Sequence, residues 1–375
     1  MIDWESRARP TLRGLERYDP GPSRDALRAL HGLAELDPLH WNEDLFGPPA
    51  HVLRAATDAV AKANFYPERA YADFREALAV WLGLPADSVI PAHGAQALIS
   101  SITSVFIGDG TQVVVPRLTY GLYAQVSAAA GGIVTPVDPD GLALDLTAIA
   151  AAARRVDARV VWICDPNNPT GTLISPAAWA AFLDELPPEA TVIADEAYID
   201  FADPSARCER TQDVLAGRPV IVVRSFSKIF GLAGLRLGYA IADPAVARLL
   251  DIVQEPFNVN RVALAAGVAS LSDPGFVDRR RAEVATARAL LEAELSRAGI
   301  RVLPSQANFS LIDVGRDEGP ICEALLQRGV LIRPGANFGL PGFARVTIAP
   351  EATMRRAARE LVDALANGAR SVNSG

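Results

Sequence analysis

The sequence predicts an α/β protein whose mostly parallel sheet is flanked by helices, followed by a smaller α+β domain. Between residues 111 and 226, short continuously apolar runs alternate with stretches of helical periodicity, as in βαβ units. From Asp273 on, a long helical stretch rich in Arg, Ala and Glu precedes short strand-like runs. With 375 residues, the chain is long enough for two or three domains.

The elements follow a turn-rich start of about fifty residues that includes YDPGPS and LHWNEDLFGPP. Helical periodicity then predicts helices over 51–63, 71–84 and 97–106. The runs TQVVVP, ARVVWIC, TVIA and PVIVVRSF predict strands buried on both faces, with a helix near AAWAAFLDEL. In the last hundred residues we expect a helix over 278–299, strands at FSLIDV, VLIR and FARVTIA, and a closing helix from APEATM.

Composition and charge exclude several classes of protein. The net charge of −8 gives no basic footprint for nucleic acid, and no apolar run is long enough to cross a membrane. MIDWESRARP lacks the apolar core of a signal peptide, so we expect a cytoplasmic protein. The three cysteines are far apart, and the four histidines lie in the first quarter of the chain. We therefore expect neither a disulfide framework nor a metal site.

Polar segments follow three of the predicted strands. DPNNPTG follows VVWIC, DEAY follows TVIA, and SFSK follows VIVVR. Ligands of open α/β sheets bind beyond the carboxyl ends of the strands, so residues 165–171, 195–198 and 225–228 should converge on one site.

Lys228 is unusual because the chain has only one other lysine, Lys62, among 36 basic residues. An amine can form a Schiff base with an aldehyde, which a guanidinium cannot. Taken alone, Lys228 is about as well explained as a surface lysine that has no chemical role. For Lys62, which lies within an amphipathic helix, that second explanation is the better one.

Residues around Lys228 favour a phosphate. The hydroxyls of Ser225 and Ser227 and the guanidinium of Arg236 suit an anion, as do free amides of Ala95 and Gln96 at an expected helix start. For these two amides, an ordinary helix start is the alternative.

Asp195 ends an apolar strand, where a carboxylate is costly unless it is paired, for example with a protonated ring nitrogen. Tyr198 and Asn168 could bond a phenolic oxygen; the alternative is a helix cap at Asp195 beside a core tyrosine. An aldehyde, a phosphate, a ring nitrogen and a ring hydroxyl together describe pyridoxal 5′-phosphate.

DPNNPTG, DEAY and SFSKIFGLAGLRLGY, in this order, resemble the fold-type I pyridoxal-phosphate enzymes of the class I/II aminotransferases. LHWNEDLFGPP, NFYPER and LTYGLY are similar to the histidinol-phosphate aminotransferase branch. The matching segments run from RYDPG near Tyr18 to FARVTIA near Arg345, which is nearly the whole chain.

The resemblance implies a role for each matching residue. Lys228 would carry the aldimine and shuttle the proton, Asp195 would pair with the ring nitrogen, and Tyr198 would hold the ring oxygen with Asn168. Tyr120 would stack on the ring, or else be a core aromatic. The phosphate would be held by Ser225, Ser227, Arg236, the amides of Ala95 and Gln96, and Tyr66 of a neighbouring subunit in a homodimer with shared sites.

On the substrate side, the resemblance implies that Arg345 grips an α-carboxylate, although a solvated strand-end arginine is the alternative. Tyr18, Asn42 and Arg333 would line the substrate pocket. The implied domains are an N-terminal segment, 1–50, that contributes to the small domain and the substrate pocket; a large cofactor-binding domain, 51–272; and a small domain, 273–375.

The chain departs from the histidinol-phosphate pattern at several positions. NEDLFGP has Asp44 and Leu45 where NENPFGP is usual, Gln96-Ala97 replaces an acidic pair, and Leu118 replaces a proline. These changes fit a related enzyme that acts on another amino acid.

The implied reaction is transamination between an amino acid, or an amino phosphate such as histidinol phosphate, and a 2-oxo acid. A pyridoxal-phosphate decarboxylase, lyase or cyclase is the alternative. A non-catalytic regulator is disfavoured because the first fifty residues carry no helix-turn-helix pattern. The substrate side chain and the pathway, whether histidine biosynthesis, aromatic transamination or a specialised route, stay open.

Overall fold

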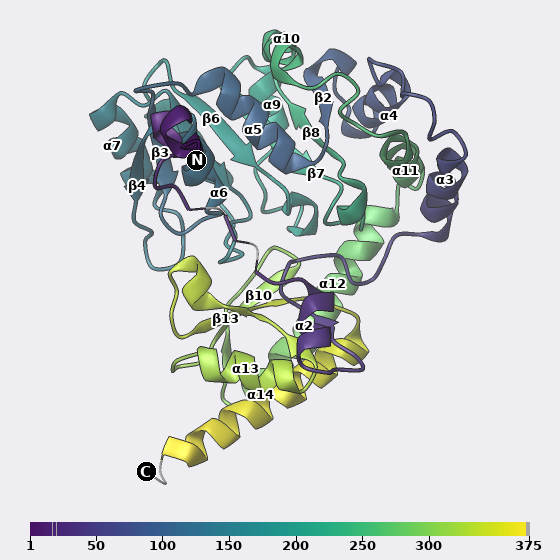
Figure 1. Cartoon of the computed structure of the whole chain (residues 1–375), viewed down its shortest axis with the longest axis vertical. Helices are drawn as coiled ribbons and strands as arrows, with labels where there is room; N and C mark the ends of the chain where they lie inside the picture. Colours follow the sequence, from purple (N-terminus) through teal and green to yellow (C-terminus); the bar gives the residue numbers. More distant parts are fainter. Residues whose placement is uncertain (17, 20, 373–375) are drawn as a thin grey trace.

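A computed structural model of the chain describes residues 1–16, 18–19 and 21–372, with side chains up to residue 366. Arg17 and Pro20 of the RYDPG segment lie outside the described residues. Figure 1 shows a larger lobe built on a seven-stranded sheet and a smaller lobe built on a four-stranded sheet, with helix α12 (Phe276–Arg297) running between them. This arrangement confirms the predicted fold class.

The large sheet has the order β2-β8-β7-β6-β5-β3-β4. All pairs between β7 and β4 are parallel, and β8 pairs antiparallel with both β7 and β2. The strands are β2 (Val89–Ala92), β3 (Gln112–Pro116), β4 (Ile133–Val137), β5 (Val160–Cys164), β6 (Thr191–Asp195), β7 (Val220–Ser225) and β8 (Gly238–Ile241).

Helices cover both faces of this sheet, which explains the continuously apolar strands. On β5, Val160, Trp162 and Cys164 belong to one core, whereas Val161 and Ile163 belong to the other. The first core contains residues of α5 (Ala95–Phe106), α6 (Leu122–Ala129) and α10 (Pro244–Val253). The second contains residues of α3 (Ala50–Val60), α4 (Ala72–Leu82), α7 (Leu146–Val156), α8 (Pro176–Asp184), α9 (Arg210–Leu215) and α11 (Arg261–Leu271).

The small sheet is antiparallel, with the order β12-β13-β10-β9. Its strands are β9 (Arg301–Val302), β10 (Phe309–Asp313), β12 (Arg333–Pro334) and β13 (Phe343–Thr347), and α13 (Gly319–Gln327) and α14 (Glu351–Val372) pack beside it. The predicted single strand VLIR is divided: β11 (Val330–Leu331) pairs with β1 (Asp37–Pro38), and Arg333 pairs with β13.

The N-terminal segment contacts both lobes. Helix α1 (Trp4–Arg7) is followed by the short 3-10 helix η1 (Pro10–Leu12), which lies beside α6. There the Thr11 hydroxyl donates to the carbonyl of Ala129 at 3.0 Å. Helix α2 (Arg24–Leu30) lies at the small lobe (Figure 1), and β1 pairs there. The first sixteen residues thus belong beside the large sheet, and the segment crosses to the small lobe before residue 37.

None of the helices in the described part of the chain combines the length and apolarity needed to cross a membrane.

Candidate active site

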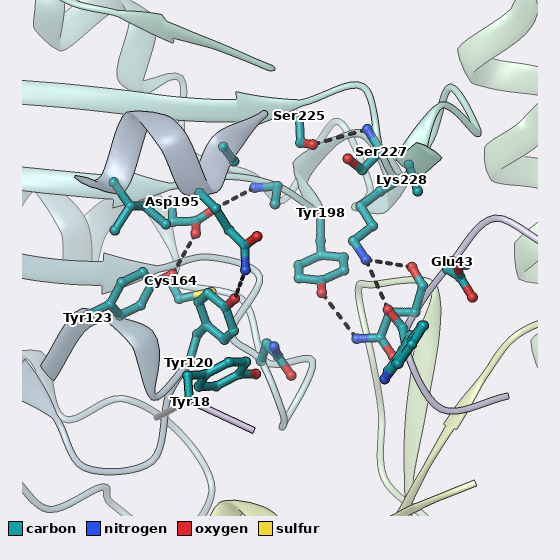
Figure 2. A pocket seen from close by; sticks show the side chains of 18 of the residues that line it. Tyr18, Glu43, Tyr120, Tyr123, Cys164, Asp195, Tyr198, Ser225, Ser227 and Lys228 are labelled. Carbon is teal, nitrogen blue, oxygen red and sulfur yellow. Dashed lines mark hydrogen bonds between the residues drawn. The ribbon is translucent and has the colours of Figure 1, made fainter. Parts of the chain in front are cut away.

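The three polar strand ends converge, as predicted, on a cavity of about 470 Å³ lined from both lobes. Every predicted site residue except Tyr66 lines it. These residues are Tyr18, Asn42, Ala95, Gln96, Tyr120, Asn168, Asp195, Tyr198, Ser225, Ser227, Lys228, Arg236, Arg333 and Arg345. Figure 2 labels Tyr18, Tyr120, Asp195, Tyr198, Ser225, Ser227 and Lys228 among them.

One end of the cavity is suited to an anion. Ala95 is the first residue of α5, so its amide is free of the helix ladder and points outward. A Cβ on Gly238 would lie 2.7 Å from the Ala95 nitrogen, and one on Gly94 would lie 2.7 Å from Nη2 of Arg236. Two glycines therefore allow the backbone and the guanidinium to form a close cradle. The hydroxyl-bearing Ser225 and Ser227 complete a donor set that fits a phosphate.

Asp195 lies at the buried end of the same cavity, on the last residue of β6. Its Oδ2 accepts a hydrogen bond from the Tyr123 hydroxyl at 2.6 Å, and its Oδ1 accepts one from the Ala197 amide at 3.0 Å. Burial raises the pKa of Asp195, while these two donors act in the opposite direction. A carboxylate so placed fits the protonated nitrogen of a pyridine ring.

Lys228 enters the cavity from the loop after β7. Its Nζ donates to the carbonyls of Trp41 at 3.1 Å and Asn42 at 2.8 Å, and it lies 5.5 Å from the ring centroid of Tyr198. Burial, helped by the charge of Arg345, lowers the pKa of Lys228 to about 8. The amine is therefore far more often neutral near physiological pH than an exposed lysine is.

Tyr198 and Asn168 line the same cavity, and hydrogen bonds join them to the N-terminal segment and to β13. Asn42 donates to the Tyr198 hydroxyl at 3.1 Å, and Arg345 donates to the Asn168 side chain at 2.5 Å. Asn42 is fully buried and has a left-handed backbone, with φ of 55°. The N-terminal segment therefore helps to position the centre of the site.

Two arginines face the other end of the cavity. Arg333 and Arg345 are direct partners in the antiparallel pair of β12 and β13, so their side chains share one face. Their guanidinium carbons lie 5.9 Å and 4.6 Å from the ring centroid of Phe338. Tyr18 also lines the cavity and packs edge-on against Tyr120, with ring centroids 5.5 Å apart. This pair of cations can bind a carboxylate or a phosphate.

Most of the departures from the family pattern lie outside the cavity lining. Asp44 forms a buried ion pair with Arg280 of α12, and Leu45 packs against the core. Leu118 is buried. Gln96 does line the cavity, and its side-chain nitrogen donates to the Tyr120 hydroxyl at 2.7 Å.

A buried ionic network beneath the site was not predicted. Arg210, on α9, donates to Asp165 at 2.8 Å and to Glu196 at 3.0 Å, and Glu196 also pairs with Arg224 at 2.8 Å. Arg210 is fully buried, with its guanidinium 4.1 Å from the ring centroid of Trp179. The network joins the ends of β5, β6 and β7. No local sequence motif indicates Arg210. The carboxylates of Asp165, in DPNNPTG, and Glu196, in DEAY, are nevertheless buried, and buried carboxylates require a cation as partner.

Glu43, Tyr123 and Cys164 also line the cavity and were not assigned from the sequence. Tyr123 could have been found from its spacing, because it follows Tyr120 by three residues at a helix start.

Tyr66 lies outside this cavity. The residue is 77% exposed, and its ring stacks on Phe257 with ring centroids 4.7 Å apart.

Comparisons with known proteins identify the class of enzyme. Residues 34–361 match the family model "Aminotransferase class I and II". The chain belongs to this family, and it is a pyridoxal-phosphate-dependent type of aminotransferase.

Two relatives are named histidinol-phosphate aminotransferase. The protein of Symbiobacterium thermophilum is 39% identical over 97% of this chain and 100% of its own length. The protein of Moorella thermoacetica is 35% identical, and the match covers 95% of this chain and 93% of its own length.

A crystal structure of histidinol-phosphate aminotransferase from Sinorhizobium meliloti, in complex with pyridoxal-5′-phosphate, has a similar fold. It superposes with a TM-score of 0.89 at 28% identity and covers 96% of this chain and 98% of that one. These relatives favour transamination over the decarboxylase, lyase or cyclase alternative.

Proposed function

We propose that this cavity binds pyridoxal 5′-phosphate and that the enzyme transfers an amino group between an amino phosphate, such as histidinol phosphate, and a 2-oxo acid. The observation that carries the proposal is the shared cavity: Lys228, Asp195 and a phosphate cradle open onto the same space as Arg333 and Arg345. The names of the relatives and the cofactor in the Sinorhizobium meliloti structure support it.

The cofactor would supply an aldehyde carbon for exchange with amines and a ring that withdraws electrons. Lys228 would hold that carbon through Nζ and, once released by the incoming amine, take the proton from the substrate Cα. Its lowered pKa suits this task, because a base must be neutral to accept a proton. Asp195 would keep the ring nitrogen protonated, and the carbonyls of Trp41 and Asn42 would receive the Lys228 ammonium after proton transfer.

The substrate end supports an amino phosphate. Arg333 and Arg345 together provide two positive charges, and a phosphate carries nearly two negative charges at pH 7. Most of the departures that had suggested another substrate, including Asp44 and Leu45, lie away from the cavity. Tyr18 and Asn42 would complete the pocket.

A donor screen tests this substrate. Histidinol phosphate, aromatic amino acids, Arg and Glu would each be mixed with the cofactor-loaded enzyme while absorbance is recorded. We expect histidinol phosphate to react with the highest kcat/KM of the amino donors in this screen. A preference for an aromatic amino acid of tenfold or more would contradict the assignment.

We also propose a cytoplasmic homodimer in which Tyr66 reaches the phosphate site of the partner. The exposed stack of Tyr66 on Phe257 supports a surface that another subunit covers. Mixing Lys228→Ala with Tyr66→Ala protein after subunit exchange should produce activity that neither variant has, because one of the two sites is then intact. No gain on mixing would contradict shared sites. The domain boundaries near residues 50 and 272 belong to the same proposal.

A further inference from the structure

The Tyr123 hydroxyl makes a shorter hydrogen bond to the Asp195 carboxylate than the Ala197 amide does. Figure 2 shows Tyr123 on the side of Asp195 that is away from Lys228, and the Tyr123 hydroxyl donates to Oδ2 of Asp195 at 2.6 Å. The other carboxylate oxygen accepts from the Ala197 amide. Each oxygen therefore has one fixed donor, and these two donors set the direction of the carboxylate.

The Tyr123 ring is itself held rigidly. It is fully buried and stacks on Trp162 with centroids 4.9 Å apart and planes 6° apart, while Tyr120 packs edge-on at 5.5 Å. The Trp162 indole donates to the hydroxyl of Ser127, one turn further along α6, at 3.2 Å. Because the ring cannot turn in this packing, its hydroxyl stays directed at Asp195.

The hydrogen bond also acts on the charge of Asp195. The carboxylate faces Tyr123, Cys164, Glu196 and Lys228, and burial raises its pKa. The Tyr123 hydroxyl opposes that rise by donating to the anion. Burial and the adjacent carboxylate raise the pKa of Tyr123 well above its usual value, so the phenol stays protonated and remains a donor.

We propose that Tyr123 is a positioning residue that orients Asp195 and keeps it anionic toward the ring nitrogen of pyridoxal phosphate. The inference rests on the proposed function, since it requires the cofactor to occupy this cavity. Tyr123 would act through Asp195, without touching the substrate.

The test compares two cofactors in the variant Tyr123→Phe, which keeps the ring and removes only the hydroxyl. Equilibrium dialysis would measure the Kd of the cofactor-free protein for pyridoxal phosphate and for its 1-deaza analogue, in which carbon replaces the ring nitrogen. We expect Tyr123→Phe to weaken binding of pyridoxal phosphate by roughly tenfold, the size of a hydrogen bond to a charged group. Binding of the deaza analogue should change less than about twofold, because that ring offers Asp195 no proton. Equal losses for both cofactors, or none, would overturn the proposal.

Two further variants keep the result interpretable. Tyr239→Phe removes another buried tyrosine hydroxyl, on β8 and outside the cavity lining, and should leave both affinities unchanged. In an Asp195→Asn background, Tyr123→Phe should cause no further loss of affinity for pyridoxal phosphate. The same double variant lacks the buried charge, so it can be measured even if Tyr123→Phe alone fails to fold. An additional loss there would contradict action through Asp195. If the unaltered protein bound no pyridoxal phosphate, the proposed function itself would fail, which is a distinct outcome.

Discussion

The proposed function divides the cavity into a cofactor half and a substrate half, and the two are built in different ways. Segments that directly follow parallel strands of one sheet form most of the cofactor half, at 165–171, 195–198 and 225–236. The substrate half combines the N-terminal segment around residues 18–43 with β12 and β13, some three hundred residues later. The cofactor half therefore comes mainly from one stretch of the chain, whereas the substrate half forms only when distant segments pack together on folding.

This difference explains why the cofactor was easier to predict than the substrate. A strand end is visible in the sequence, and parallel strands bring their ends to one edge. The hydrogen bonds that join the halves, from Asn42 to Tyr198 and from Arg345 to Asn168, follow no sequence pattern.

The largest effect is expected in the cofactor half. Lys228→Ala should lower kcat by about ten thousandfold, at the upper range for a group that moves a proton, because no other amine reaches the cavity among its described lining residues. Lys62→Ala, which changes the only other lysine, is the matched control and should retain full turnover. Steady-state assays of both variants provide the measurement, and full turnover by Lys228→Ala would overturn the mechanism.

The next effect concerns the support beneath the cofactor half. Arg210→Met should lower the free energy of unfolding by about 3–5 kcal/mol, because it leaves the buried Asp165 without its cation and Glu196 with Arg224 alone. Arg218→Met removes the exposed pair with Asp184 and should cost no more than about 1 kcal/mol. Urea denaturation of the cofactor-free proteins compares the two. Similar costs for both changes would mean that the buried network contributes little.

A pair of arginine variants separates the halves directly. Arg333→Gln should lower kcat/KM for histidinol phosphate by about 10- to 100-fold while leaving cofactor affinity unchanged, because it removes one charge-assisted contact. Arg236→Gln should weaken cofactor binding by a similar factor. Kinetics and dialysis on both variants test the division, and a cofactor defect in Arg333→Gln would show that the halves are not separable.

The smallest effect is expected in the pH dependence of cofactor capture by Lys228, which Arg345 of the substrate half should shift. The rate at which cofactor-free protein captures pyridoxal phosphate should rise with pH and level off above about 8, because only neutral Lys228 reacts. Removing the positive charge in Arg345→Gln should move that midpoint upward, since Arg345 helps to lower the pKa of Lys228. Stopped-flow absorbance gives the profile. A wild-type midpoint near 10.5, the ordinary lysine value, would contradict the burial of this amine.

The elements missed from the sequence share a physical cause. β4 contains a proline and is partly exposed at the sheet edge, and β8 is short and begins with glycine, so neither looks like a buried strand. VLIR reads as one strand, but Ile332 separates two short pairings in different sheets.

Arg210 and Tyr123 were missed because their importance comes from contacts with Asp165, Glu196 and Asp195 that form only on folding. Sequence patterns therefore predicted the main strands and most of the polar side chains that line the cavity, and they did not reveal Arg210 or Tyr123.

We propose that Lys228, Asp195, Arg333 and Arg345 form one site for transamination of an amino phosphate. A single half-reaction tests it most directly: cofactor-loaded enzyme is mixed with histidinol phosphate in the absence of a 2-oxo acid, and the products are quantified. We predict conversion of one equivalent of pyridoxal phosphate to pyridoxamine phosphate per chain. Continued turnover with release of ammonia, and no pyridoxamine phosphate, would contradict the claim.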